Sequence, residues 1–127
     1  MSETEVTVLT VDDQVVFRDA ARDVISATDG FESVGDAGTG EEALAAVERL
    51  RPDLVLLDVR MPGCGGIEAA RRITAAHPET VVVLISIEDS EEFSEDAYAS
   101  GAAGLVRKQD FGPAILRSIW EAHGAHV

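Results

Sequence analysis

Short runs of aliphatic residues alternate along the chain with segments whose apolar residues recur at helical spacing. The clearest runs are residues 6–11, 54–57 and 80–85, and weaker ones lie at 33–37 and 103–106. The clear runs stay apolar and do not alternate with polar residues, which is typical of strands buried on both faces of a parallel sheet. The pattern predicts five strands, of which the one at 33–37 is the weakest.

The segments between the strands carry helix start and stop signals. Thr39-Gly40-Glu41-Glu42 is a capping box, in which the Thr39 hydroxyl and the Glu42 carboxylate satisfy backbone N–H groups at a helix start. Gly30 is predicted to end the first helix in the left-handed conformation. Asp110 is predicted to cap the last helix, with Pro113 tolerated in its first turn.

A helix between the fourth and fifth strands completes the alternation. Asp89 and Glu92 resemble its cap, and Gly101 is predicted to end it. Strands that alternate with helices predict an α/β fold with a parallel sheet. We expect a single flavodoxin-like (βα)5 domain over residues 1–127, with a five-stranded sheet of order 2-1-3-4-5 and helices on both faces.

Composition narrows the functional classes. The net charge of −14 argues against direct binding of nucleic acid, whose backbone would be repelled. No apolar stretch approaches the length of a membrane span, and acidic residues before the first apolar run argue against a signal peptide. The single cysteine, Cys64, cannot form an internal disulfide, which fits a reducing compartment. We therefore expect a cytoplasmic protein.

Polar side chains follow four of the predicted strands. In an open parallel sheet, ligands bind outside the carboxyl ends of the strands. One such residue alone would be explained as a turn former or helix cap. Several groups at one edge favour a binding site. They are Asp12 and Asp13 after the first strand, Asp58 after the third, Ser86 after the fourth, and Lys108 after the fifth.

The chemistry of this set points to phosphate. Three carboxylates at one rim repel one another, and a hard divalent cation such as Mg²⁺ resolves that conflict through oxygen ligands. Lys108 brings a positive charge suited to phosphate, and Ser86 brings a hydroxyl donor. Beside Mg²⁺ and Lys108, Asp58 can act as a nucleophile toward a phosphoryl group. The sequence therefore predicts a Mg²⁺-dependent phosphoryl site.

Over nearly its whole length the chain resembles the receiver domain of two-component response regulators. The matching motifs are Val11-Asp12-Asp13, the segment 51–63 around Asp58, Ser86, and Gly101-Ala102-Ala103-Gly104 leading to Lys108. The segment 51–63 is most similar to receivers of the NarL/FixJ class, which usually precede a DNA-binding helix-turn-helix domain. No such domain is present in these 127 residues.

The resemblance implies a role for each site residue. Asp58 is the phospho-acceptor and takes its phosphoryl group from a sensor histidine kinase. The implied metal ligands are Asp12 (through water), Asp13, Asp58 and the backbone carbonyl of Arg60, and the implied phosphoryl ligands are Ser86 and Lys108.

A signalling switch is the function that the resemblance implies. The domain would catalyse its own phosphorylation and dephosphorylation and would not be a metabolic enzyme. Its fourth helix, fifth strand and fifth helix would form the output face and a homodimer interface. We expect regulation of transcription through a DNA-binding domain that is missing or separate, because residues 122–127 resemble the start of a linker.

Two alternatives stay open. The first is a phosphorylation-independent interaction module on the same fold. The second is a phosphatase that passes through an aspartyl phosphate, although Arg60 stands where such enzymes typically place an acid.

Three positions depart from the family pattern. Leu105 replaces an aromatic residue, so we expect a weak or different response of the output face. Ile87 replaces a small residue beside Ser86, and its bulk predicts slow labelling by small phosphodonors. Gln109 replaces a proline, so the loop that carries Lys108 is expected to be less rigid.

Overall fold

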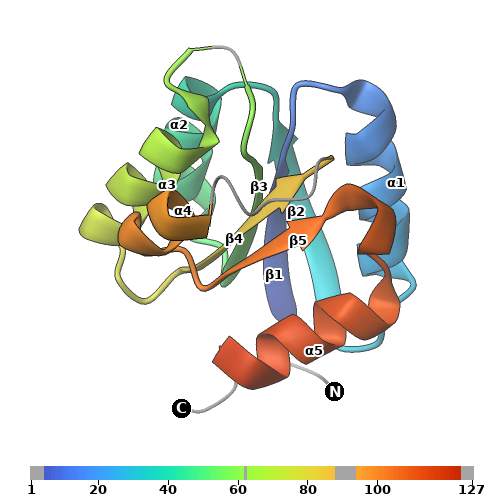
Figure 1. Cartoon of the computed structure of the whole chain (residues 1–127). Coiled ribbons are helices and arrows are strands. Elements are labelled where there is room, and N and C mark those ends of the chain that lie inside the picture. Colours follow the sequence, from blue (N-terminus) through green and yellow to red (C-terminus); the bar gives the residue numbers. More distant parts are fainter. Residues whose placement is uncertain (1–4, 62, 88–93, 124–127) are drawn as a thin grey trace.

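A five-stranded parallel sheet forms the centre of the molecule in the computed structural model, which describes residues 5–61, 63–87 and 94–123 (Figure 1). The strand order is β2-β1-β3-β4-β5, and every pairing is parallel. This confirms the predicted fold class. The strands are β1 (Val6–Val11), β2 (Phe31–Ala37), β3 (Leu54–Asp58), β4 (Val81–Ser86) and β5 (Gly104–Arg107).

Helices cover both faces of the sheet. Figure 1 shows α1 and α5 on one side and α2, α3 and α4 on the other. The helices are α1 (Val15–Ser26), α2 (Gly40–Leu50), α3 (Gly65–Ala76), α4 (Ser94–Ala99) and α5 (Pro113–His123), and a short 3₁₀ turn (Lys108–Asp110) follows β5. None of the helices in the described ranges is long and apolar enough to cross a membrane.

Two apolar layers hold this arrangement together. Successive side chains of a strand point to opposite faces, so Val55 and Leu57 of β3 join the layer under α2 and α3, whereas Leu54 and Leu56 join the layer under α1 and α5. All five residues of β3 are buried, including Asp58 at its end. The central strand is therefore fixed along its whole length, and it holds Asp58 at the rim of the core.

Some helix ends follow the sequence signals. The Glu42 N–H donates to the Thr39 hydroxyl at 3.1 Å, which confirms Thr39 as the cap of α2. The Glu42 carboxylate accepts instead from the Gly38 N–H, one residue earlier than in the standard box. Gly101 has a φ of +96° and is the second residue after the end of α4, as the predicted stop requires. The predicted cap residues Asp89 and Glu92 lie outside the described residues.

Two residues that were predicted to cap helices do not do so. Helix α1 ends at Ser26 with Ala27 as its cap, and Gly30 uses its positive φ in the turn before β2 instead. Asp110 lies in the 3₁₀ turn and accepts from the Arg107 side chain at 3.0 Å, while α5 begins only at Pro113. In both places a tight turn separates the residue from the helix that it was expected to cap.

Candidate functional site

Register in the sheet brings the predicted site residues to one edge. Val11 of β1 pairs with Leu57 of β3, so Asp12 and Asp58 come next on neighbouring strands. Asp58 pairs with Ile85, and Ser86 pairs with Arg107, so Ser86 and Lys108 follow at the same edge.

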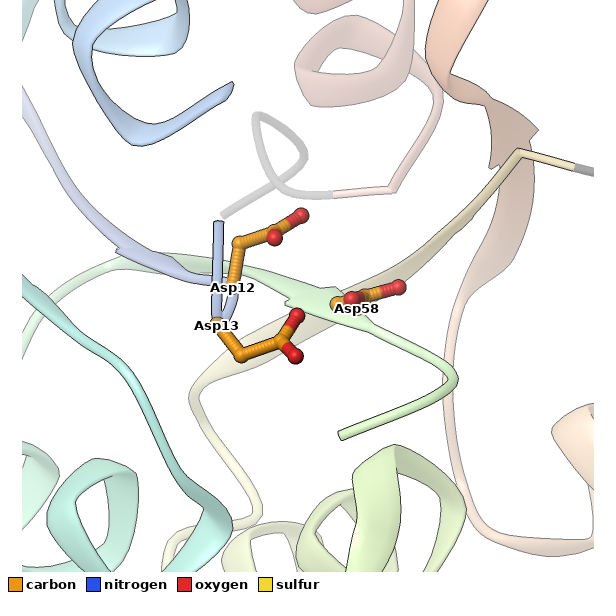
Figure 2. Close-up of side chains that lie close together, drawn as sticks. All are labelled: Asp12, Asp13 and Asp58. Atoms are coloured by element: carbon orange, nitrogen blue, oxygen red, sulfur yellow. The ribbon is translucent and has the colours of Figure 1, made fainter. Parts of the chain in front are cut away.

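The three carboxylates form a cluster in the described part of the chain. Figure 2 shows Asp12 and Asp13 after the end of β1, beside Asp58 at the tip of β3. Each offers an oxygen, and these oxygens all lie within 4.8 Å of one another. Asp12 is fully buried, Asp58 nearly so, and Asp13 is exposed. The cluster thus opens to solvent on the side of Asp13.

Asp12 accepts a hydrogen bond at one carboxylate oxygen and forms an ion pair at the other. Its Oδ1 accepts a hydrogen bond from the Gln14 N–H at 2.8 Å. Its Oδ2 lies 2.6 Å from the ammonium nitrogen of Lys108, whose side chain is 11% exposed. A buried charge needs such partners, because an unpaired carboxylate in the core is strongly destabilising.

Lys108 lies between the carboxylates and an aromatic ring. Its Nζ is 3.8 Å from Asp58 Oδ2, farther than from Asp12, and 3.4 Å from the side-chain oxygen of Gln14. The same nitrogen lies 4.8 Å from the centroid of the Phe17 ring, a cation–π arrangement. Lys108 thus contacts two carboxylates, an amide oxygen and an aromatic ring, and the expected effect of Gln109 on the rigidity of this loop stays a prediction.

Burial and like charges raise the pKa of Asp58. Removal from water has the largest effect, and the negative charge of Asp12 adds to it. Lys108 and the Arg60 N–H, which lies 3.4 Å from Asp58 Oδ1, act in the opposite direction. The balance brings the pKa to about 6. Asp58 is thus ionised at neutral pH, but its charge is only partly compensated by the protein.

A pocket opens above these groups. Its free volume is about 160 Å³, which is room for several water molecules. Ser86 is buried in its wall, whereas Ile87 is 62% exposed at its margin. The lining residues are Asp13, Gln14, Asp58, Arg60, Ser86, Ile87 and Lys108.

The sequence analysis missed two residues of the site. Gln14 lines the pocket and contacts Lys108, and only its position after the acidic pair could have indicated this. Phe17 lies under Lys108 and contacts Phe111, with ring centroids 6.2 Å apart. In the sequence, Phe17 looks like an ordinary apolar position of a helix, so no local signal distinguishes it.

The donor set fits a hard divalent cation. Oxygen atoms of three carboxylates lie close together, and two of these residues, Asp13 and Asp58, line a pocket with room for water. Mg²⁺ prefers oxygen ligands and keeps several waters. Zinc sites, in contrast, use cysteine and histidine. The chain offers neither among the residues that line this pocket.

Comparisons with known proteins agree with this geometry. Residues 8–119 match the family model of the response regulator receiver domain. The response regulator GacA of Pseudomonas viridiflava is 40% identical over 101 residues, which are 80% of this chain and 47% of GacA. The uncharacterized transcriptional regulatory protein YxjL of Bacillus subtilis is 34% identical over 119 residues, which are 94% of this chain and 55% of YxjL. The chain thus spans about half the length of these relatives.

A solved structure shows the same architecture. The signal receiver domain of the NarL regulator from Mycobacterium tuberculosis superposes with a TM-score of 0.86 at 31% identity, covering 93% of this chain and 95% of that domain. The fold, the sheet order and the family match agree, and the chain belongs to the response regulator receiver domains of two-component systems.

Proposed function

We propose that the chain is a Mg²⁺-dependent phospho-receiver that takes a phosphoryl group onto Asp58 from a sensor histidine kinase. The observation that carries the proposal is the placement of Asp58. It lies nearly buried at the end of a central strand, beside two further carboxylates and one lysine, in a pocket that opens to solvent. A charge in this position is destabilising for the fold and useful for chemistry.

Asp58 acts as the nucleophile. A carboxylate oxygen of Asp58 forms a bond to phosphorus, and the bond from phosphorus to the imidazole nitrogen of the kinase breaks. The electron pair of that bond stays on the imidazole, which takes up a proton as it leaves. Because the pKa of Asp58 is about 6, the ionised form that attacks is the main form at neutral pH.

Four groups are proposed to hold Mg²⁺. Asp13 and Asp58 ligate it directly, Asp12 acts through water, and the backbone carbonyl of Arg60 completes the protein ligands. When bound, the ion neutralises charge on the transferring phosphoryl oxygens and on the carboxylate cluster.

Ser86 and Lys108 are proposed to bind the phosphoryl oxygens. The Lys108 ammonium lies 3.8 Å from Asp58 Oδ2, and both side chains line the pocket. A lysine is a suitable partner for phosphate as a point charge, and a serine hydroxyl can donate one hydrogen bond. Charge neutralisation and positioning are the main requirements of phosphoryl transfer.

The output of the switch is proposed to be transcriptional. The curated relatives include transcriptional regulators that are about twice as long as this chain, so a separate segment would contact DNA. Residues 1–127 would act as one receiver domain, without direct contact to nucleic acid. Phosphorylation would change the face of α4, β5 and α5, through which we propose homodimerisation.

A phosphorylation-independent interaction module is the second candidate. The departures at Ile87 and Leu105 favour it. Ile87 projects at the margin of the pocket, and Leu105 packs against the apolar layer under α2 and α3 where an aromatic switch residue is usual in the family. Neither departure removes a group that the phosphoryl chemistry needs.

Intact-mass spectrometry after incubation with a small phosphodonor separates the two candidates. Uptake of one phosphoryl group is expected with Mg²⁺ and not with a chelator. Asp58→Asn is the control, because asparagine keeps the shape of the side chain and lacks the nucleophilic carboxylate. No adduct on the wild type, or an adduct that survives Asp58→Asn, would favour the interaction module.

A further inference from the structure

The Arg18 side chain reaches from α1 to the backbone of the acidic pair. Its Nη1 donates a hydrogen bond to the backbone carbonyl oxygen of Asp12 at 2.6 Å. Asp12 is fully buried and the Arg18 side chain is 19% exposed, so this contact is largely shielded from water. Hydrogen bonds from a charged donor are stronger than those between neutral groups.

Together with two other hydrogen bonds of Asp12, this contact holds the turn after β1 in place. The Asp12 N–H donates to the Ala37 carbonyl at 3.0 Å, and Asp12 Oδ1 accepts from the Gln14 N–H. The carbonyl that Arg18 binds belongs to the peptide plane between Asp12 and Asp13. Because that plane sets the direction in which the next residue leaves the backbone, its orientation is one of the factors that set where the Asp13 carboxylate points.

Residues of β2 and of the loop after it also contact the guanidinium. Arg18 Nε lies 3.9 Å from a carboxylate oxygen of Asp36 on β2. A Cβ atom at position 38 would lie 3.2 Å from Arg18 Nη1, so Gly38 leaves the space that the guanidinium needs. The Glu42 carboxylate fixes Gly38 in turn through its N–H at 2.8 Å. The Arg18 side chain thus lies close to the residue after β1, to β2 and to the loop after β2.

We propose that Arg18 is a positioning residue for the metal site, which aims Asp13 by fixing the carbonyl of Asp12. Arg18 does not line the pocket itself, so its influence passes through the backbone. The inference rests on the proposed Mg²⁺-dependent function. Partners that orient metal ligands in this way commonly change metal affinity when they are removed.

Whether the loss of Arg18 raises or lowers the Mg²⁺ affinity separates a positioning role from a simple electrostatic one. Arg18 is a cation near a cation site, so removal of its charge alone would strengthen Mg²⁺ binding. Loss of the fixed carbonyl would weaken Mg²⁺ binding, because Asp13 would then sample orientations in which it cannot bind.

The test compares Arg18→Met with Arg22→Met by calorimetric titration with Mg²⁺. Arg22 is a matched control, because it also lies on α1 and contacts the same Asp36 carboxylate, at 3.5 Å, and because its recorded partners, Asp19 and Asp36, do not include Asp12. Arg18→Met is expected to weaken Mg²⁺ binding about tenfold, and Arg22→Met to leave it near the wild-type value. An affinity of Arg18→Met equal to or tighter than the wild type would overturn the proposal.

Labelling by a small phosphodonor gives a second readout. Arg18→Met should raise the Mg²⁺ concentration needed for half-maximal rate and leave the rate at saturating Mg²⁺ close to the wild type. If Arg18→Met does not fold, Arg18→Gln carries the test, because glutamine is shorter than arginine and its amide lacks the charge that strengthens the contact to the Asp12 carbonyl. Its affinity should then fall below the wild type, and an unchanged value would contradict the proposal. Failure of the wild type to bind Mg²⁺ or to accept a phosphoryl group would instead refute the proposed function.

Discussion

Gly66 offers a sharp test of how the backbone positions Asp58. It lies in the first turn of α3, and a Cβ atom built there would lie 1.9 Å from the carbonyl oxygen of Asp58 and 2.8 Å from Val59 Cα. The Gly66 N–H also donates to the Val59 carbonyl at 3.0 Å. Because both clashes are with backbone atoms, no change of rotamer can relieve them.

The magnitude of Gly66→Ala follows from these distances. Real Cβ atoms essentially never lie closer than 3.0 Å to such a neighbour. The chain at Asp58 and the first turn of α3 must therefore move apart by about 1 Å, and a displacement of that size at a reacting group can lower a rate about 100-fold. Overpacking of this kind lowers the free energy of unfolding by about 1–3 kcal/mol.

Helix propensity alone predicts that Gly66→Ala raises the free energy of unfolding, so the measured direction of the change is informative. Gly66 is not among the glycines with a positive φ, so alanine suits its backbone and would raise stability by about 1 kcal/mol if the site were open. The assay combines thermal unfolding with the rate of phosphoryl uptake at saturating Mg²⁺. Gly112→Ala is the control, because its Cβ would meet no atom within 4 Å. A Gly66→Ala protein that is more stable and labels at the wild-type rate would refute the reasoning.

Three further predictions concern the charge and access of the pocket. The pKa of Asp58 rises from 3.8 to about 6 on folding, so its contribution to stability is full below pH 3.8 and is lost as pH rises through about 6. Asp58→Asn should therefore raise the free energy of unfolding of the metal-free protein by up to about 3 kcal/mol at pH 8, with a smaller gain at pH 5, by chemical denaturation; equal gains would contradict it. Lys108→Met should raise the pKa of the Asp58 carboxyl, because Lys108 holds it down, and an NMR titration that shows a fall would contradict this. Ile87→Ala should speed labelling by small phosphodonors, because Ile87 stands at the pocket margin, and an unchanged rate would exclude crowding there.

The sheet and the site edge could be predicted because their signals are local and repeated. Each strand is a run of apolar residues, and β3 is buried along its whole length, so the position of Asp58 follows from the pattern alone. Parallel register then brings residues after different strands to one edge. The helix ends were less predictable: Gly30 and Asp110 have suitable side chains, but turns of a few residues move the helix boundaries away from them.

The contacts that tune the site could not be predicted, because they join distant parts of the chain. The preference of Lys108 for Asp12 over Asp58 depends on distances across the pocket. The roles of Arg18 and Gly66 depend on backbone atoms of Asp12 and Asp58, which carry no signature in the sequence. The sequence shows which chemical groups are present, whereas the orientation of their side chains and their pKa values depend on packing.

The electrostatics of the pocket support the proposed response to a cation and a phosphoryl group. Within the cluster of three carboxylates, the Lys108 ammonium contacts Asp12 and Asp58 and lies closer to Asp12. The raised pKa of Asp58 shows that this compensation is incomplete. A partly uncompensated buried charge destabilises the folded state, and an added positive charge nearby reduces that cost. On the proposed function, Mg²⁺ binding would therefore stabilise the folded chain, and a phosphoryl group on Asp58 would give Lys108 a stronger partner than Asp12. If Lys108 shifted from Asp12 toward a phosphorylated Asp58, the change would reach β5, because Lys108 directly follows that strand.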